Sequence, residues 1–513
     1  MSRVEKALKN AKVSVLFYLL ATFTAFFTRK IFLNYLGDDF MGLTGTLKSI
    51  LGFLNLAELG IGTAIGFTLY KPLFDNNENE IKRLVNLIGY LYKRLGFIII
   101  GAGIIVSLFF PLIFENQSID KKIIYIGFYS YLISAGFGFF INYSQVVLQS
   151  DQKGYVITSI FQSFNISRQI VQALIAFYLK DFVLWLIMEL VFSLLNSYYI
   201  NKKVKKTYPF LNGKVNLSTS IRNEYPTVIK KIKQVFVHRI SSFVTSGTDQ
   251  ILIYALVNLK SVAFFGNYSM IFTQVSTLIN TIFSGIGSGI GNLVAENDAK
   301  KINDVFWEMM GIRFFLTGVF VINLFFLINP LITVWLGSEY ILSDLFVYLM
   351  LFNLAMQIIR LPIDNYVTAY GLYQDTWAPI AQMSINLGVS IFFGIKMGIS
   401  GIMLGTSISM FLIIFLWKPY FLFKKGFNQK ASIKFWPKFL VMLLSFTLSF
   451  IATYIIVNKF IEIKYLTLFE IGWSAIKINL VLLPFLSLIF YSLNEGFRKF
   501  SSRILIMLRK YAP

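Results

Sequence analysis

The chain carries a long succession of apolar stretches, each long enough to cross a lipid bilayer as a helix. A membrane-spanning helix needs about 20 predominantly apolar residues, and windows of that length give about fourteen such stretches in this sequence. Their limits are 12–36, 41–70, 84–114, 122–149, 155–179, 181–201, 227–256, 261–294, 302–329, 341–372, 376–396, 399–423, 435–457 and 470–494. A soluble chain is about one-quarter charged, whereas this one is 14% charged and 56% hydrophobic. The sequence therefore predicts an all-α polytopic membrane protein.

The positions of Lys and Arg predict the orientation of the chain. The formal net charge is +22, and most basic residues fall in the N-terminal tail, in every second loop and in the C-terminal tail. Because basic loops stay on the cytoplasmic side of a membrane, both termini are predicted to be cytoplasmic. This distribution explains the charge without nucleic-acid binding. The basic segment FRKFSSRILIMLRK (497–510) is predicted to lie as an amphipathic helix on the anionic inner leaflet.

The first twelve stretches resemble two copies of one six-span unit. GIGTAIG (60–66) in the second stretch matches GIGSGIG (285–291) in the eighth. Two further matches follow the same order: Asn142-Tyr143 with Asn365-Tyr366, and Lys9 and Lys12 with Lys230 and Lys233. Because six is an even number, both units insert the same way up, related by a pseudo-twofold axis along the membrane normal. The predicted parts are a six-helix lobe 1–203, a cytoplasmic linker 204–226, a six-helix lobe 227–425, and two extra helices with a basic tail 426–513.

Several charged residues fall inside the predicted spans, where the positive loops do not explain them. The basic ones are Arg29, Lys48, Lys93, Arg94, Arg168, Arg239, Arg313, Arg360 and Lys477. The acidic ones are Glu58, Glu189, Asp249, Glu308 and Asp364. A charge near the bilayer centre is costly, so such residues face the bundle interior or a water-filled cavity and indicate function. Some have simpler interpretations, since Lys93 and Arg94 suit a cytoplasmic extension and Lys477 suits snorkelling.

Arg168 and Arg360 lie too far from the ends of their spans for easy snorkelling. Arg168 lies in QSFNISRQIVQ (162–172), a run rich in Gln, Asn and Ser, which predicts a wet helix face. Arg360 lies in RLPID (360–364), where Asp364 is one turn away and can pair with it. That pair is open to a purely structural interpretation as well as a functional one.

The stretch VFVHRISSFVTSGTDQILIY (235–254) contains the only histidine of the chain. At 100° per residue one polar stripe follows this helix: Arg239, Ser242, Ser246 and Gln250, with Asp249 on its margin. The stripe suits the wall of a cavity, and snorkelling of Arg239 to the inner boundary is the alternative. His238 points elsewhere and suits the lipid interface better than a proton relay.

Together these positions predict a central cavity lined mainly by cations. The predicted binding residues are Arg29, Lys48, Arg168, Arg239 and Arg360, and the predicted ion-coupling residues are Glu58, Asp249 and Asp364. The glycines at 60–66 and 285–291 allow either close helix packing or local unwinding around a substrate. Guanidinium and ammonium groups that are already in place suit an anion, above all a phosphate or pyrophosphate.

Several kinds of chemistry are not expected. The chain contains no cysteine, which excludes disulfides, zinc-thiolate sites and a thiol nucleophile. No Walker A sequence is present, so ATP is not expected to drive the protein directly. The longest predicted outer loops run to only about a dozen residues, too short for the catalytic loop of a membrane enzyme. No enzyme activity, metal or cofactor is predicted, and no cleavable signal peptide is evident.

Three stretches resemble one transporter family: YLGDDFMGLTGTLKSILGFLNLAELGIGTAIG (35–66), VVLQSDQKGYVITSI (146–160) and HRISSFVTSGTDQILI (238–253). They are similar to bacterial polysaccharide flippases of the Wzx type, in the multidrug/oligosaccharidyl-lipid/polysaccharide exporter superfamily. The resemblance implies two six-helix lobes plus two C-terminal helices in the bacterial cytoplasmic membrane. It also implies alternating access for an undecaprenyl-pyrophosphate-linked oligosaccharide, with a polysaccharide polymerase as a further partner.

The leading hypothesis is therefore a flippase that moves lipid-linked oligosaccharide to the outer leaflet for a capsule, exopolysaccharide or O-antigen. Coupling to an ion gradient and pull by downstream polymerisation both stay open. One alternative is a cation-coupled drug exporter of the same superfamily, in which buried carboxylates would be expected to dominate. Another is an exporter of a related precursor, lipid II or a teichoic-acid unit.

Overall fold

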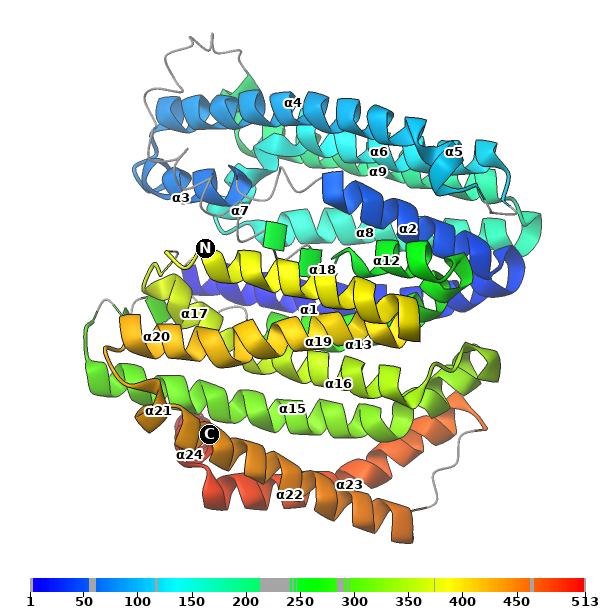
Figure 1. Ribbon diagram of the computed structural model, residues 1–513. Coiled ribbons are helices and arrows are strands. Elements are labelled where there is room, and N and C mark those ends of the chain that lie inside the picture. Colours follow the sequence, from blue (N-terminus) through cyan, green and yellow to red (C-terminus); the bar gives the residue numbers. More distant parts are fainter. Residues whose placement is uncertain are drawn as a thin grey trace. The chain divides into compact units, whose positions relative to one another are not determined.

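The computed structural model describes residues 3–54, 61–115, 119–212, 240–241, 244–245, 247–283, 290–291, 293–294, 296–372, 374–461 and 466–511. Every regular element in these residues is a helix, which confirms the predicted all-α class (Figure 1). Eleven helices of the described part are long and apolar enough to cross a membrane. They are Lys12–Leu36, Glu78–Leu108, Lys121–Phe140, Phe182–Thr207, Leu259–Ile282, Ala299–Trp335, Asp344–Ala369, Trp377–Met397, Ile399–Lys425, Trp436–Phe460 and Leu468–Leu493.

Three predicted spans are absent from that set, each for a different reason. The stretch 41–70 is described as two shorter helices on either side of residues 55–60, which lie outside the described part. The stretch 155–179 is helical, but its run of Gln, Asn and Ser makes it less apolar than the others. Most of 227–256 lies outside the described residues.

The chain divides into two compact units, Met1–Gly266 and Asn267–Pro513. The limits predicted from the repeat stay a prediction, because residues 213–239, around the predicted second boundary, lie outside the described part.

Helices of the first unit pack around one apolar core. They are α1 (Arg3–Leu36), α2 (Asp38–Leu54), α3 (Ile61–Phe74), α4 (Glu78–Leu108), α5 (Phe110–Ile113), α6 (Lys121–Phe140), α7 (Val146–Ser150), α8 (Gly154–Leu174), α9 (Phe182–Thr207), α12 (Asp249–Leu256) and the start of α13 (Leu259–Ile282). The buried side chains include Leu43, Ile88, Phe128 and Leu186. Helix α1 packs on α8, α8 on α9, and α6 on both α9 and α2. This packing brings α1, α2, α8 and α9 together, and these helices carry the charged residues discussed below.

The second unit has an aromatic core. Its helices are α15 (Ala299–Trp335), α16 (Asp344–Ile359), α17 (Leu361–Ala369), α18 (Trp377–Met397), α19 (Ile399–Ser409), α20 (Lys418–Lys425), α21 (Ala431–Lys434), α22 (Trp436–Phe460), α23 (Leu468–Leu493) and α24 (Glu495–Tyr511). Phe306 on α15 makes edge contacts with Tyr366, Phe423 and Phe427. Edge-to-face contacts of this kind favour one arrangement of the rings. They tie α15 to α17 and α20.

The predicted kink at Pro362 marks the division between α16 and α17. Proline lacks a backbone N–H and clashes with the carbonyl four residues earlier, so a helix breaks or kinks there. Arg360 is both the C-cap residue of α16 and the N-cap residue of α17, and Pro362 lies in the first turn of α17.

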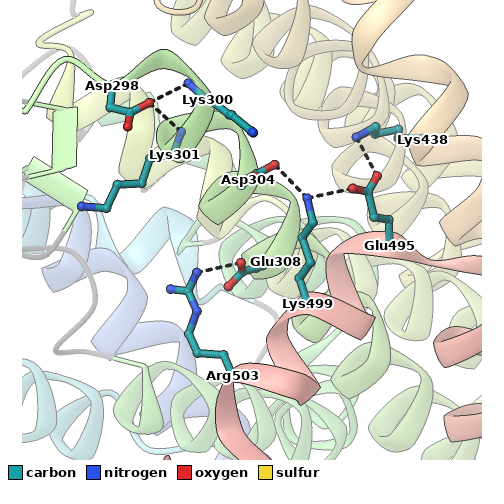
Figure 2. Close-up of polar contacts among 9 residues, drawn as sticks. All are labelled: Asp298, Lys300, Lys301, Asp304, Glu308, Lys438, Glu495, Lys499 and Arg503. Atoms are coloured by element: carbon teal, nitrogen blue, oxygen red, sulfur yellow. Dashed lines mark hydrogen bonds and ion pairs between the residues drawn. The ribbon is translucent and has the colours of Figure 1, made fainter. Parts of the chain in front are cut away.

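Helix α15 is longer than the bilayer requires. Its 37 residues extend about 55 Å at 1.5 Å per residue, against a hydrocarbon thickness of about 30 Å. The end near Ala299 carries ion pairs to α24, from Asp304 to Lys499 and from Glu308 to Arg503 (Figure 2). That end of α15 and helix α24 therefore lie on the same side of the membrane.

Candidate functional site

Four charged side chains of the first unit come from four different helices. Arg29 lies on α1, Lys48 on α2, Arg168 on α8 and Glu189 on α9. The charge of Lys48 interacts electrostatically with those of Glu189, Arg168 and Arg29. Two of the five predicted binding residues, Lys48 and Arg168, thus lie within electrostatic range of the Glu189 carboxylate, and a third, Arg29, lies within range of Lys48.

Arg168 forms the centre of this group. Its Nη1 is ion-paired with Oε2 of Glu189, and both side chains are 17% exposed. Its Nη2 donates to Oδ1 of Asn165 at 2.7 Å, and the amide of Asn165 donates to Oε1 of Gln162 at 3.2 Å. The polar run predicted as a wet face is therefore a connected set of hydrogen bonds that orients the guanidinium.

Lys48 presents its ammonium to the same group. Its Nζ lies 5.0 Å from the centre of the Tyr131 ring, a cation–π contact. Lys48 is exposed, whereas Leu47 beside it is buried. The ammonium interacts with charges on α1, α8 and α9, three helices that pack near α2.

Arg29 reaches from α1 to the beginning of α13 within the first unit. Its Nη2 donates to the backbone carbonyl of Ala263 at 3.3 Å. Gly266 lies one turn further, and a Cβ there would stand 2.7 Å from the same nitrogen. The absence of a side chain at Gly266 therefore gives the guanidinium its space.

This group has more positive than negative charge. It holds three cations and one carboxylate: Lys48 and Arg168 interact with Glu189, and Arg29 interacts with Lys48. An ionised arginine in such a place can exchange a carboxylate for a phosphate, since its planar N–H fork suits both. The arrangement can therefore bind an anion, with Glu189 holding the cations in place when no anion is present.

One residue of the predicted polar stripe 239–250 contacts α2, the helix that carries Lys48. Gln250 accepts a hydrogen bond from Ser49, the residue after Lys48, at 3.0 Å. Asp249 is buried at 5% exposure and begins α12. Arg239 and Glu58, as well as Ser242, Ser246 and His238, lie outside the described residues.

The predicted pair in the second unit is present. Nε of Arg360 lies 3.1 Å from Oδ2 of Asp364, which confirms the pairing predicted from their spacing. The other carboxylate oxygen of Asp364 lies 2.7 Å from Nζ of Lys418 on α20. One carboxylate is thus shared by two cations, and Asp364, predicted for ion coupling, is engaged by both.

Two members of these groups were absent from the predicted site. Glu189 is one of the acids inside the predicted spans but is not among the predicted site residues, and Lys418 is not among the charged residues singled out from the sequence. A signal for Glu189 did exist, because it is the acid of the span that follows Arg168. Lys418 had no such signal, since 54 residues separate it from Asp364.

Comparison with known proteins identifies the fold. No protein-family model and no curated protein matches the sequence. Among solved structures, the chain shares its fold with a lipid II flippase and with MATE-family multidrug transporters, one of which is described as a member of the MOP superfamily.

The particular structures include the lipid II flippase MurJ in an inward closed conformation, with a TM-score of 0.67 and 18% identity over 93% of this chain and 99% of that one. A multidrug resistance MATE transporter in an inward-facing conformation has a TM-score of 0.57 and 14% identity, over 81% of this chain and 99% of that one. A MATE transporter from Vibrio cholerae has a TM-score of 0.55 and 12% identity, over 82% of this chain and 99% of that one. At these identities the likeness concerns the fold.

Proposed function

We propose that the protein is a flippase for lipid-linked oligosaccharides. It would move undecaprenyl-pyrophosphate-linked repeat units from the inner to the outer leaflet of the bacterial cytoplasmic membrane by alternating access. The observation that carries this proposal is the group of three interacting cations, Lys48, Arg168 and Arg29, which includes a single carboxylate, Glu189. A diphosphate that crosses a bilayer needs such counter-charge along its path.

Each cation has a role in the proposed mechanism. Arg168 would exchange Glu189 for the diphosphate, while Lys48 supplies a second positive charge near it. Arg29, Arg239 and Arg360 would complete the path, and Asp249, Glu58 and Asp364 are the candidates for ion coupling. The products served would be a capsule, an exopolysaccharide or an O-antigen, with a polymerase as the downstream partner.

A related substrate is the second candidate. The likeness to the lipid II flippase is greater than the likeness to the MATE transporters, with TM-scores of 0.67 against 0.57 and 0.55. This favours a lipid-linked precursor over a drug, and it includes lipid II and teichoic-acid units. The charged residues inside the predicted spans point the same way, because basic ones outnumber acidic ones nine to five, whereas carboxylates would be expected to predominate in a cation exporter.

Transport in liposomes tests the proposal. The purified protein is reconstituted with a fluorescent undecaprenyl-diphosphate-linked saccharide, and the outer-leaflet fraction is followed with an impermeant quencher. Arg168→Ala and Lys48→Ala are each expected to slow the appearance of quenchable lipid at least about tenfold, the effect of one lost charge-assisted contact. Lys396→Ala, which removes an exposed cation stacked on Phe392, serves as the control and should transport normally.

The same assay separates the candidates. Lipid II transported in place of the saccharide lipid would favour the second candidate, and transport of neither by the wild-type protein would refute both. Normal transport by stably folded Arg168→Ala would contradict the proposed role of the cationic group in binding the diphosphate.

A further inference from the structure

A buried arginine in the second unit has no counter-ion among the described residues. Arg313 is the fifteenth residue of α15 and is 3% exposed. It lies about 21 Å along the helix from Ala299 at 1.5 Å per residue and is therefore deep in the span. Its Nε and Nη1 are buried without a hydrogen-bond partner in the part of the chain that the structure describes.

One aromatic contact holds the guanidinium. Its Cζ lies 4.2 Å from the centre of the ring of Phe283, just beyond the end of α13. Such stacking covers the face of the guanidinium plane and contributes about 2 kcal/mol when the pair is desolvated. The N–H donors lie in the plane, however, so the ring leaves them unsatisfied.

The neighbouring acids of α15 are already paired with other cations. Oδ1 of Asp304 lies 3.1 Å from Nζ of Lys499, and Oε1 of Glu308 lies 2.9 Å from Nη2 of Arg503, as Figure 2 shows. No described carboxylate of the unit lies within 4.0 Å of the Arg313 guanidinium. The two carboxylates of α15, Asp304 and Glu308, are therefore paired with cations of α24, and neither compensates the charge of Arg313.

The position of Arg313 on α15 explains this division. The backbone of Gly311 meets Phe497 of α24 so closely that a Cβ would stand 2.6 Å from the Phe497 nitrogen. Arg313 is two residues further, about 200° around the helix at 100° per residue, and so points away from α24. It points instead into the unit, toward Phe283.

Burial of a charged group without a partner is expensive for a fold. The effective cost is several kcal/mol per ion after relaxation, and an apolar side chain of similar volume would avoid it. An ionised residue kept inside a membrane protein on these terms indicates a functional site. The chemistry of the unsatisfied donors is specific, because in-plane guanidinium N–H groups bind the oxygens of phosphates and carboxylates two at a time.

We infer that Arg313 is a second anion-binding residue, which engages a phosphate group of the transported molecule through its unpaired in-plane N–H donors. The inference rests on the proposed function for the identity of the molecule, but not for the existence of the site. Phe283 covers the face of the guanidinium, so the anion approaches its edge and the side chain stays oriented in its absence.

The test uses inorganic pyrophosphate as the probe and the full-length purified protein in detergent. Arg313→Met removes the charge and keeps an unbranched apolar side chain, and Arg313→Lys keeps the charge but removes the planar fork. Arg94→Met is the matched control, because Arg94 is also stacked on a ring, that of Tyr90, but is exposed. Equilibrium binding of pyrophosphate and the thermal unfolding midpoint are measured for each.

A binding role predicts that Arg313→Met unfolds at or above the wild-type temperature, since an unpaired buried charge has been removed. Both Arg313 variants should bind fewer pyrophosphate ions, or bind them at least about tenfold more weakly, while Arg94→Met binds normally. An unchanged binding isotherm in the Arg313 variants would overturn the inference, as would wild-type protein that binds no pyrophosphate. If Arg313→Met does not fold, the isotherm of Arg313→Lys decides.

This result is independent of the transport assay. Altered pyrophosphate binding in the Arg313 variants, combined with no saccharide-lipid transport by the wild type, would refute only the proposed function. Unaltered binding with normal transport by the wild type would refute only the role of Arg313.

Discussion

Arg168 shows how an ionised side chain can be held inside an apolar bundle. Its two terminal nitrogens are divided between a carboxylate on another helix and an amide one turn away on its own. Removal of one member of a buried ion pair leaves the other uncompensated, which costs more than removal of both. Arg313 lies at the other extreme, because its compensation among the described residues is an aromatic ring.

The pair around Glu189 gives a prediction about stability. Glu189→Gln should lower the free energy of unfolding by about 1–3 kcal/mol, less than a fully buried pair because both side chains are 17% exposed. The double variant Arg168→Met, Glu189→Met should recover part of the loss. Thermal or chemical unfolding in detergent compares these proteins, and the cycle of wild type, Arg168→Met, Glu189→Met and the double variant gives the coupling energy. A double variant no more stable than Glu189→Gln alone would show that the pair is not the source of the loss.

At the scale of elements, α24 is attached to α15 by backbone contact as well as by charge. A Cβ on Gly496 would stand 2.1 Å from the backbone oxygen of Trp307. Figure 2 shows Lys499 between Asp304 and Glu495, and Lys438 of α22 beside Glu495. Exposed Ile504, Leu505 and Ile506 follow on the same helix, as expected of a segment that lies on a membrane surface.

Substitution of Gly496 should detach this helix. Gly496→Ala forces the backbones of α15 and α24 apart and should destabilise the protein by about 1–3 kcal/mol. Gly472→Ala in α23 is the matched control, because a Cβ there meets nothing within 4 Å, and it should stabilise by about 0.5–1 kcal/mol. Thermal midpoints and the mobility of a spin label at Ser502→Cys report both effects. The chain has no other cysteine. Equal midpoints for the two variants would contradict the close contact.

The ion pairs of α24 predict a dependence on pH. Hydrogen bonding to Lys499, with the charge of Lys438, lowers the pKa of Glu495 below its ordinary 4.5. Hydrogen bonds to Glu495 and Asp304 raise the pKa of Lys499 above its ordinary 10.5. The contribution of Glu495 is therefore present above pH 4.5 and lost as the pH falls through its lowered pKa. That of Lys499 is present below pH 10.5 and lost as the pH rises through its raised pKa.

Helix α24 should consequently be most firmly attached between these two limits. The change is expected to be small, within about 1 kcal/mol, because the pairs are exposed. Spectra of the Ser502 spin label at acid, neutral and alkaline pH measure it, and Lys499→Met should abolish the alkaline transition. A label equally mobile at all three pH values would show that the charges do not contribute.

At the scale of the whole molecule, the hydropathy of the sequence predicted most of the membrane-spanning helices. It did not predict which helices lie side by side. Apolar runs identify spans because lipid requires their length and composition. The pairing of Arg360 with Asp364 was predictable because both lie on one helical turn. The pairing of Arg168 with Glu189 and of Asp364 with Lys418 was not, because it depends on which helices become neighbours.

The orientation of the whole chain is the remaining prediction from the distribution of basic residues. The positive-inside rule expects the loop before α4 to be cytoplasmic and the loop after α15 to be external. Both can be tested by single cysteines at exposed positions, Asn79→Cys in the first turn of α4 and Ser338→Cys beyond α15. In intact cells an impermeant maleimide should label Ser338→Cys, whereas Asn79→Cys should react only after the membrane is opened. The reverse labelling pattern would mean that the chain has the opposite orientation in the membrane. The cations grouped with Glu189 would then have to receive their anion from the opposite leaflet.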